Sequence, residues 1–298
     1  MAADGLLSVL FPSHCRFCQA PLTRASRLPV CATCLEAIRP IGGPVCAACG
    51  ERLFSPEWCV PSPEPSSEPR VASPENSSRT RGPVAIRSER DGALLCLQCM
   101  QKEPAFTRAA AYGSYDGGLR ELIHLLKYDA VRPAANVLGR MLAEVIADIA
   151  DAFGDRAPVI LPVPLHQDKL RQRGFNQAEL IARAALKLKP AALEVKLNTS
   201  TLTRHRATES QTGLTPQQRR ENVRGAFRVA GCDEIAGRDI LLIDDVFTTG
   251  TTASECARVL RRAGAERVWV ATVARVLKPE AERAQPEIEE ERAMAAHV

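Results

Sequence analysis

Two adjacent aspartates stand between an apolar run and a turn that is rich in hydroxyl groups. Asp244 and Asp245 follow the apolar residues 240–243. The turn after them contains Thr248, Thr249, Gly250, Thr251 and Thr252. Backbone N–H groups, threonine hydroxyls and the positive end of a following helix favour a phosphate, whereas carboxylates suit ribose hydroxyls or a hydrated Mg²⁺. The segment therefore predicts a buried strand, a loop and a helix N-terminus that together bind a sugar phosphate.

The order of residue types makes this segment more specific than its parts. Adjacent carboxylates after a strand are often only a turn or a helix cap, and Thr and Gly clusters are common in loops. Here the apolar run, the two acids, two more apolar residues and Thr-Thr-Gly-Thr-Thr precede an amphipathic helix predicted at 253–263. The segment lacks the Gly-Lys-Ser/Thr of a Walker loop and the G-x-G-x-x-G of a dinucleotide-binding fold. A phosphate loop of another type is indicated.

Two further segments could supply cations to a phosphorylated ligand. Arg171 and Arg173 precede a glycine and a helix start, where two guanidinium groups could bind a pyrophosphate in bidentate fashion. Arg204 and Gln211 lie in a polar, non-periodic stretch at 204–214, which predicts a mobile flap that closes over the substrate. A solvated basic loop is the alternative for both segments.

The cysteines indicate a second kind of chemistry. Four C-x-x-C pairs are present, namely Cys15/Cys18, Cys31/Cys34, Cys46/Cys49 and Cys96/Cys99. Each pair presents two thiolates to one ion and two pairs complete a tetrahedral Cys₄ site, so four pairs predict two structural zinc ions. We expect the first pair to join the second, across a gap of 12 residues, and the third to join the fourth. The interleaved pairing of the first with the third stays open.

Disulfides and free core cysteines are the alternatives to zinc. The total of eleven cysteines is odd, and the N-terminus has neither the cationic lead nor the cleavage site of a signal peptide. Both observations favour a reducing cytoplasm and metal ligation. Closed Cys₄ sites leave no open coordination position, so we expect the zinc to fold its module rather than to catalyse.

Hydrophobic periodicity predicts the elements that must position these groups. Strands are predicted at 159–163, 240–243 and 268–273, and helices at 119–126, 138–149, 176–188 and 253–263. Strands that alternate with helices imply a mostly parallel sheet with right-handed crossovers. His124 and Lys127 share the first of these helices with a leucine stripe, and their position favours surface residues over ligands.

Composition divides the chain of 298 residues into three parts. Nine of the eleven cysteines precede residue 100 and mark an N-terminal module at 12–103, whose Pro-, Ser-, Glu- and Arg-rich insertion at 55–90 is predicted to be disordered. An α/β domain at 109–277 and an acidic tail at 278–298 follow. The net charge of +4 does not indicate nucleic-acid binding, and no apolar stretch reaches the roughly 18 residues of a membrane helix.

These residues carry a resemblance to a known family. The segment 240–252 resembles the signature of type I phosphoribosyltransferases that binds phosphoribosyl pyrophosphate (PRPP). With the four cysteine pairs, L-I-H-L-L-K-Y at 122–128 and R-Q-R-G-F-N-Q at 171–177, the chain resembles the ComF/GntX family from Cys15 to about Arg275. The resemblance implies a type I phosphoribosyltransferase-like parallel sheet flanked by helices, with a small N-terminal double zinc ribbon.

The resemblance also implies roles for the residues of the acid segment. Asp244 and Asp245 would face the ribose hydroxyls of PRPP, residues 248–252 would hold its 5′-phosphate, and Mg²⁺ would accompany the ligand. Purine phosphoribosyltransferases of the hypoxanthine type carry an Asp three residues after the second acid, where it assists the base. Thr248 occupies that position here, so a hypoxanthine-like acid–base role is not expected.

Two functions of different classes follow. A Mg²⁺-dependent transferase would substitute at C1′ of PRPP and expel pyrophosphate, whose charge Arg171 and Arg173 would help to neutralise. A non-catalytic PRPP or nucleotide sensor would instead bind a protein partner or single-stranded DNA through its zinc ribbons. Some family members are linked to competence for DNA uptake, beside a helicase-like partner. Few aromatics are available to stack on bases, so DNA is the less favoured contact. These are Phe17, Phe54 and Trp58.

Overall fold

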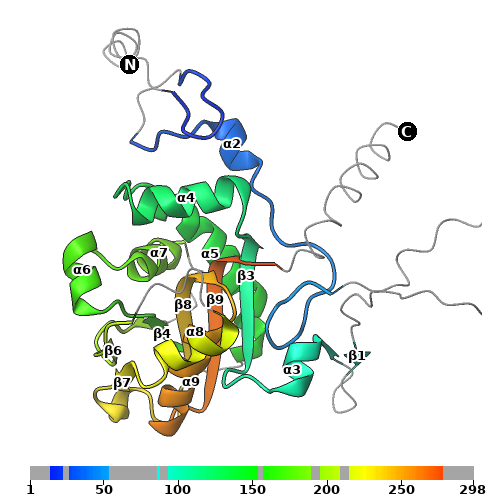
Figure 1. Cartoon of the computed structure of the whole chain (residues 1–298), viewed down its shortest axis with the longest axis vertical. Coiled ribbons are helices and arrows are strands. Elements are labelled where there is room, and N and C mark those ends of the chain that lie inside the picture. Colours follow the sequence, from blue (N-terminus) through cyan, green and yellow to red (C-terminus); the bar gives the residue numbers. More distant parts are fainter. Residues whose placement is uncertain are drawn as a thin grey trace, which may run out of the picture. The chain divides into compact units, whose positions relative to one another are not determined.

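The computed structural model describes residues 14–22, 27–53, 86–87, 93–153, 157–188, 195–208 and 215–277 (Figure 1). The chain forms two compact units. The first contains Met1–Ile41 and Pro104–Val276, and the second contains Gly42–Glu103 and Leu277–Val298. Several sequence predictions lie outside the described residues, namely those on Gln211, on the tail at 278–298 and on most of the insertion at 55–90.

A five-stranded parallel sheet in the order β3-β9-β8-β4-β5 is the centre of the first unit. Its strands are β3 (Arg108–Ser114), β4 (Val159–Pro162), β5 (Lys196–Leu197), β8 (Asp239–Phe247) and β9 (Arg267–Arg275). Residues 240–243 and 268–271 are fully buried, which explains why these strands read as continuous apolar runs rather than alternating ones. The parallel sheet expected from the sequence is confirmed.

Helices cover both faces of this sheet. They are α4 (Gly117–Lys127), α5 (Ala134–Ala150), α7 (Gln177–Leu186) and α9 (Thr251–Arg262). On one face Leu241 and Ile243 join the core formed by α4, α5 and α7. On the other face Ala253 of α9 lines a small hollow together with Val246 and Val270 of the strands. Successive side chains of β8 point to opposite faces of the sheet, so the strand packs against helices on both faces.

The helices predicted from leucine periodicity form where expected. α4 buries Leu119, Leu122, Ile123 and Leu126, which recur at the spacing of one helix face. α5 buries the predicted stripe from Leu138 to Ile149 in the same way. Both helices turn these stripes toward the sheet, and within the described residues no helix is long and apolar enough to span a membrane.

The crossing of α5 and α7 is so close that it requires a glycine. A Cβ added to Gly139 would lie 2.5 Å from the Cβ of Ala184 and 2.9 Å from the backbone nitrogen of Ala185. The two helix backbones approach where all three residues are small. This packing fixes α7, whose N-terminal end reaches the acid segment of β8.

A two-stranded sheet and one helix form what we call the hood. The strands are β6 (Leu202–Arg204) and β7 (Phe227–Val229), and the helix is α8 (Pro216–Val223). β6 and β7 are antiparallel. α8 begins with a capping box, in which Thr215 and Gln218 each accept a hydrogen bond from the other's backbone N–H. The hood is not predicted by any pattern in the sequence. Arg204, expected at the start of a mobile loop, is instead the last residue of β6.

The first two cysteine pairs share the core of the first unit. We call the segment 14–41 that carries them the first ribbon. Cys15 and Val30 are buried in the same cluster as the leucines of α4. A Cβ added to Gly118 would lie 3.2 Å from Ile38 and 3.3 Å from Phe17, so the ribbon packs tightly on the start of α4. The short elements of the cysteine-rich segments are α2 (Ala32–Glu36), β1 (Ile86–Arg87), β2 (Leu94–Leu95) and α3 (Leu97–Gln101).

Candidate functional site

Asp244 and Asp245 lie inside β8, and their side chains leave the strand on opposite faces. Asp244 still pairs with Thr272 of β9, so the strand is regular at this point and successive side chains alternate. Asp245 contacts Lys127 and Gln177 on the face covered by α4 and α7. Asp244 lines the hollow on the α9 face. The strand end predicted before the two acids is wrong, because β8 continues to Phe247.

Asp245 is the centre of a polar network that joins three helices to β8. Its carboxylate is only 5% exposed and forms an ion pair with Nζ of Lys127, whose side chain is 16% exposed. Gln177 at the start of α7 donates from Nε2 to Oδ1 of Asp245 at 3.2 Å. Arg173, the last residue of α6 (Gln167–Arg173), donates from Nη1 to Oε1 of Gln177 at 2.5 Å. The carboxylate is therefore held from two sides.

The two acids have opposite electrostatic environments. Burial raises the pKa of Asp244 well above its ordinary value, and the neighbouring charge of Asp245 raises it further. Burial also opposes ionisation of Asp245, but the Lys127 ammonium and hydrogen bonds outweigh it and lower the pKa of that carboxyl. Asp245 is thus the ionised member of the pair, and Asp244 readily accepts a proton or a cation.

The C-terminal end of α4 forms one wall of this network. Tyr115 OH lies 3.0 Å from Nε2 of His124, the His124 ring packs against Tyr128 at 5.1 Å, and the Arg173 guanidinium lies 5.8 Å above the Tyr128 ring. The prediction that His124 and Lys127 are surface residues is wrong for Lys127, which is mostly buried against Asp245. His124 is half-buried.

The hydroxyl-rich turn lies on the other face, beside Asp244. The hollow there is lined by Asp244, Val246, Phe247, Thr248, Gly250, Thr251, Thr252, Ala253, Val270 and Thr272. α9 begins at Thr251, two residues earlier than predicted, so Thr251 and Thr252 of the threonine turn belong to its first helical turn. The first N–H groups of a helix have no partners within the helix and carry its positive dipole end. This arrangement suits an anion.

Gly250 is the residue that lets the chain turn from β8 into α9. Its φ of +70° lies in the left-handed region, and an added Cβ would lie 2.5 Å from Cζ of Phe247. Both the backbone angle and the close ring exclude larger residues. Beside it, the hydroxyls of Thr249 and Thr251 are 2.7 Å apart and share a hydrogen bond.

The arginines predicted from the sequence are placed differently from one another. Arg173 reaches the Asp245 network, but Arg171 is 73% exposed and pairs with Asp168 at 2.5 Å. Arg204 of the hood lies over the Phe227 ring at 5.4 Å and donates to Thr208. Burial lowers the pKa of Arg204, and the nearby Cys256 and Asp244 oppose this shift. The structure thus brings Arg173 and Arg204, but not Arg171, toward the two acids.

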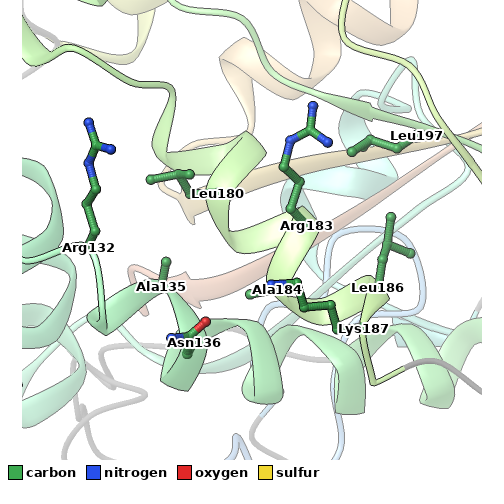
Figure 2. A pocket seen from close by; sticks show the side chains of 9 residues that line it. All are labelled: Arg132, Ala135, Asn136, Leu180, Arg183, Ala184, Leu186, Lys187 and Leu197. Carbon is green, nitrogen blue, oxygen red and sulfur yellow. The ribbon is translucent and has the colours of Figure 1, made fainter.

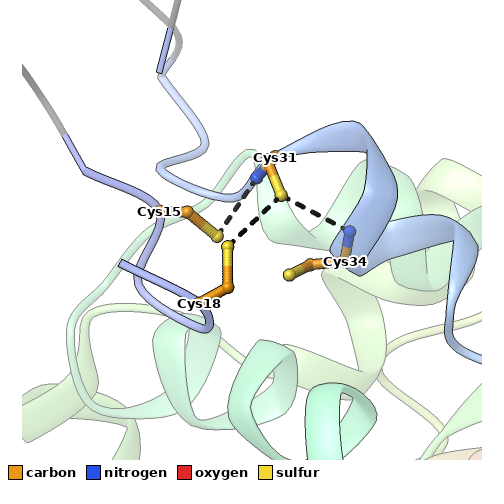
Figure 3. A group of neighbouring side chains, drawn as sticks. All are labelled: Cys15, Cys18, Cys31 and Cys34. Carbon is orange, nitrogen blue, oxygen red and sulfur yellow. Dashed lines mark hydrogen bonds between the residues drawn. The ribbon is translucent and has the colours of Figure 1, made fainter. Parts of the chain in front are cut away.

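The eight paired cysteines form two groups of four. Within each group the four sulfur atoms lie within 4.8 Å of one another. One group joins the first pair with the second, and the other joins the third with the fourth, as preferred from the sequence. Figure 3 shows the first group, in which Cys31 N–H donates to Sγ of Cys15 at 3.3 Å and the sulfurs of Cys18 and Cys31 are 3.7 Å apart. Gly50, directly after the third pair, has a φ of +70°, as a tight knuckle requires.

The donor set of the first group fits a zinc ion. Burial opposes ionisation of Cys15, but N–H donors from Cys18, Cys31 and Phe17 lower its pKa to about 6. The neighbouring Cys31 raises the pKa of Cys34 to about 12. The site thus has four converging sulfurs, of which one ionises readily and another resists ionisation. This is the donor set that a divalent cation completes, with release of protons from the thiols. Two Cys₄ groups therefore fit a double zinc ribbon.

A cavity of 490 Å³ opens at a different place, where α5, α7 and β5 meet (Figure 2). Arg132, Arg183 and Lys187 surround an apolar floor that includes Leu180 and Leu197. Arg183 is already paired with Glu179 at 2.7 Å. None of the predicted site residues that the structure describes lines this cavity, so the acid site and the cavity are separate features.

Comparison with protein families gives two matches along this chain. Residues 6–61 match a double zinc ribbon domain, and residues 168–290 match a phosphoribosyl transferase domain. The first match contains the first three cysteine pairs, and the insertion separates the fourth pair from them. The second match contains the acid segment, the hood and α9.

Three known proteins are similar to parts of this chain. The DNA utilization protein YhgH of Escherichia coli O157:H7 is 35% identical over 185 residues, which is 62% of this chain and 79% of that protein. Competence protein F of Haemophilus influenzae is 31% identical over 182 residues, which is 60% of this chain and 78% of that protein. A hypoxanthine phosphoribosyl transferase of Trypanosoma cruzi is 14% identical and has a TM-score of 0.32, over 49% of this chain and 76% of that chain.

Proposed function

This chain belongs to the ComF/GntX family of proteins with a double zinc ribbon and a phosphoribosyltransferase domain, and we propose that it binds PRPP with Mg²⁺ beside Asp244 and Asp245. The observation that carries the proposal is the hollow on the α9 face of the sheet. It combines a carboxylate, a row of threonine hydroxyls and the N-terminus of a helix of 12 residues. A sugar phosphate needs these three kinds of partner.

The residues of the hollow have separate tasks in this proposal. The first turn of α9 and residues 248–252 receive the 5′-phosphate through N–H and hydroxyl donors. Asp244 accepts hydrogen bonds from the ribose hydroxyls, which fixes the orientation of C1′. Carboxylate oxygens of Asp244 and Asp245 are the ligand type that Mg²⁺ takes, directly or through water, and the bound ion would neutralise charge on the pyrophosphate.

We propose that the chemical step is phosphoribosyl transfer. The bond from C1′ to the pyrophosphate oxygen breaks as the acceptor nucleophile bonds to C1′, and pyrophosphate leaves with the bonding electrons. Arg173 is the guanidinium we assign to the leaving group, because it lies one side chain away from Asp245. Arg171 points to Asp168 and has no role in this proposal. We assign to Arg204 of the hood the task of covering the sugar and excluding water.

Calorimetry with PRPP and Mg²⁺ tests the binding step. We expect the wild type to bind and Asp244→Asn to lose most of its affinity. Asp233→Asn is the matched control, because it removes the same charge from an exposed acid of η3 (Cys232–Glu234), away from the hollow. Equal affinity for all three proteins would overturn the proposal. A pyrophosphate-release screen over nucleobases and amines then tests transfer.

A sensor is the second candidate function, and Thr248 favours it. The loop has a hydroxyl where hypoxanthine enzymes place an acid, so it supplies no general base at this position. Binding of PRPP without pyrophosphate release for any acceptor would select the sensor. The names of two relatives refer to DNA utilization and to competence. We propose that a sensor or an enzyme of this kind would act with a helicase-like protein or single-stranded DNA as its partner. A gel shift that persists after zinc removal would exclude the ribbons as the DNA contact.

A further inference from the structure

Lys127 is paired with the Asp245 carboxylate, the group that a divalent cation at this site would bind. Its Nζ forms an ion pair with Oδ2 of Asp245, while Gln177 donates to Oδ1 of the same group. Both oxygens of Asp245 are therefore engaged by donors of this chain. A metal ion that approaches Asp245 must first displace the ammonium group.

The position of Lys127 is specific rather than incidental. Lysine is among the residues least often buried, and a buried ammonium is costly unless it is paired. Lys127 is the last residue of α4, so its side chain could extend into solvent, yet 84% of it is covered and it points to β8. Buried ion pairs are no more stabilising than well-packed apolar residues, so stability alone does not explain this pair.

A bound polyanion would give the Lys127 ammonium a second partner besides Asp245. Arg173 lies next to the network through Gln177 and brings a further positive charge to the same face. Burial opposes the charged form of Lys127, but the Asp245 carboxylate outweighs burial and raises the pKa of Lys127. A phosphate group placed between Lys127 and Arg173 would find two cations already in position.

We infer that Lys127 is an internal cation that competes with divalent metal for Asp245, so that metal binds at the acid pair only together with a polyanion. The polyanion is the pyrophosphate group of a ligand such as PRPP, and this part of the inference rests on the proposed function. The ammonium leaves Asp245 for the pyrophosphate, and the metal takes the carboxylate. Metal and ligand then bind in a coupled manner, since each removes an obstacle to the other.

Binding of Mn²⁺, measured by electron paramagnetic resonance on the zinc-loaded full chain, tests this inference. Without a polyanion, we expect Lys127→Met to bind Mn²⁺ about tenfold more tightly than the wild type, because the competing charge is gone. Lys127→Arg keeps the charge and should bind Mn²⁺ as weakly as the wild type. Lys187→Met is the matched control, because it removes a lysine charge at the exposed far end of α7.

Added pyrophosphate provides the second arm of the experiment. It should strengthen Mn²⁺ binding by the wild type more than binding by Lys127→Met, which has no ammonium to release. If the wild type and Lys127→Met bind Mn²⁺ with equal affinity in the absence of a polyanion, the inference is overturned. This outcome does not depend on whether PRPP binds. If PRPP fails to bind the wild type while pyrophosphate still couples to Mn²⁺, the proposed function fails and the inference stands.

A direct measurement covers the case in which Lys127→Met does not fold. The ¹⁵Nζ resonance of Lys127 in the wild type, assigned by its absence in Lys127→Arg, reports the ion pair. Mg²⁺ with pyrophosphate should shift this resonance, and Mg²⁺ alone should not. A resonance that stays unchanged under both conditions overturns the inference.

Discussion

Removing the charge of Lys127 should destabilise the protein, and most of the loss should disappear when Asp245 is neutralised as well. The side chains of the pair are 16% and 5% exposed, so little solvent screens them. Two unit charges about 4 Å apart interact by about 4 kcal/mol at an effective dielectric constant of 20, and breaking a buried pair costs about 3–5 kcal/mol. Lys127→Met should therefore cost about 3–5 kcal/mol, and the double variant with Asp245→Asn about 2 kcal/mol less.

The cost of Lys127→Met should also depend on pH. The pKa of Asp245 is lowered in the folded wild type, so the pair stabilises the protein above the unfolded carboxyl pKa and this contribution is lost as pH falls. Without Lys127, burial raises the pKa of Asp245, and the folded variant then binds a proton more tightly than its unfolded chain. The difference in stability between the two proteins should shrink as the pH falls from 7 to about 4.

Urea unfolding followed by tryptophan fluorescence measures these differences. Trp269 is 6% exposed in β9, so its signal reports unfolding of the sheet in the first unit. Lys187→Met is again the control and should change stability by less than about 0.5 kcal/mol, as expected for an exposed side chain. A coupling energy below about 0.5 kcal/mol between Lys127 and Asp245 would refute the reasoning, because exposed pairs give values of that size.

Three further predictions use the same structure. Gly250→Ala should weaken PRPP binding in calorimetry and lower stability to urea by about 1–3 kcal/mol, whereas Gly237→Ala has a similar positive φ but open space and should leave PRPP binding unchanged. Gly139→Val should lower stability to urea by about 3 kcal/mol or more, because its new atoms meet the backbone of α7, while Gly42→Val, with nothing within 4 Å, should stay near the wild type. Elemental analysis of the reduced protein should find two zinc ions per chain, one for each cysteine group, and a content well below two would contradict both sites.

The parts of the fold that the sequence predicted are those with strong periodicity. α4 and α5 carry regular leucine stripes, and β8 and β9 are apolar runs that burial on two faces explains. α8 was missed because its eight residues are almost all polar and have no stripe. Its capping box, rather than an apolar face, indicates where it begins. β6 and β7 are only three residues long, too short for a period to be read.

The candidate site was predicted in composition but not in geometry. The residue types around Asp244 predicted a phosphate loop, which stays a prediction, and the sequence did not show that β8 continues through both acids and turns them to opposite faces. Lys127 was missed for a related reason. It lies one turn after Ile123, at the edge of the buried face and at the end of α4, where a long side chain can reach either solvent or the core. Only the position of Asp245 in three dimensions decides between them.

The packing of the first ribbon on α4 makes its zinc ion a thermodynamic ligand of the α/β fold. Cys15 is buried in the same cluster as the α4 leucines, and Phe17 and Ile38 meet Gly118 at the start of that helix. An ion that binds only the folded ribbon adds its binding free energy to every element that unfolds with the ribbon. α4 ends at Lys127, so metal supply to the cysteines sets how firmly the helix behind the acid site is held. Zinc depletion would therefore weaken the support of the acid site, although the zinc ion contacts neither Asp244 nor Asp245.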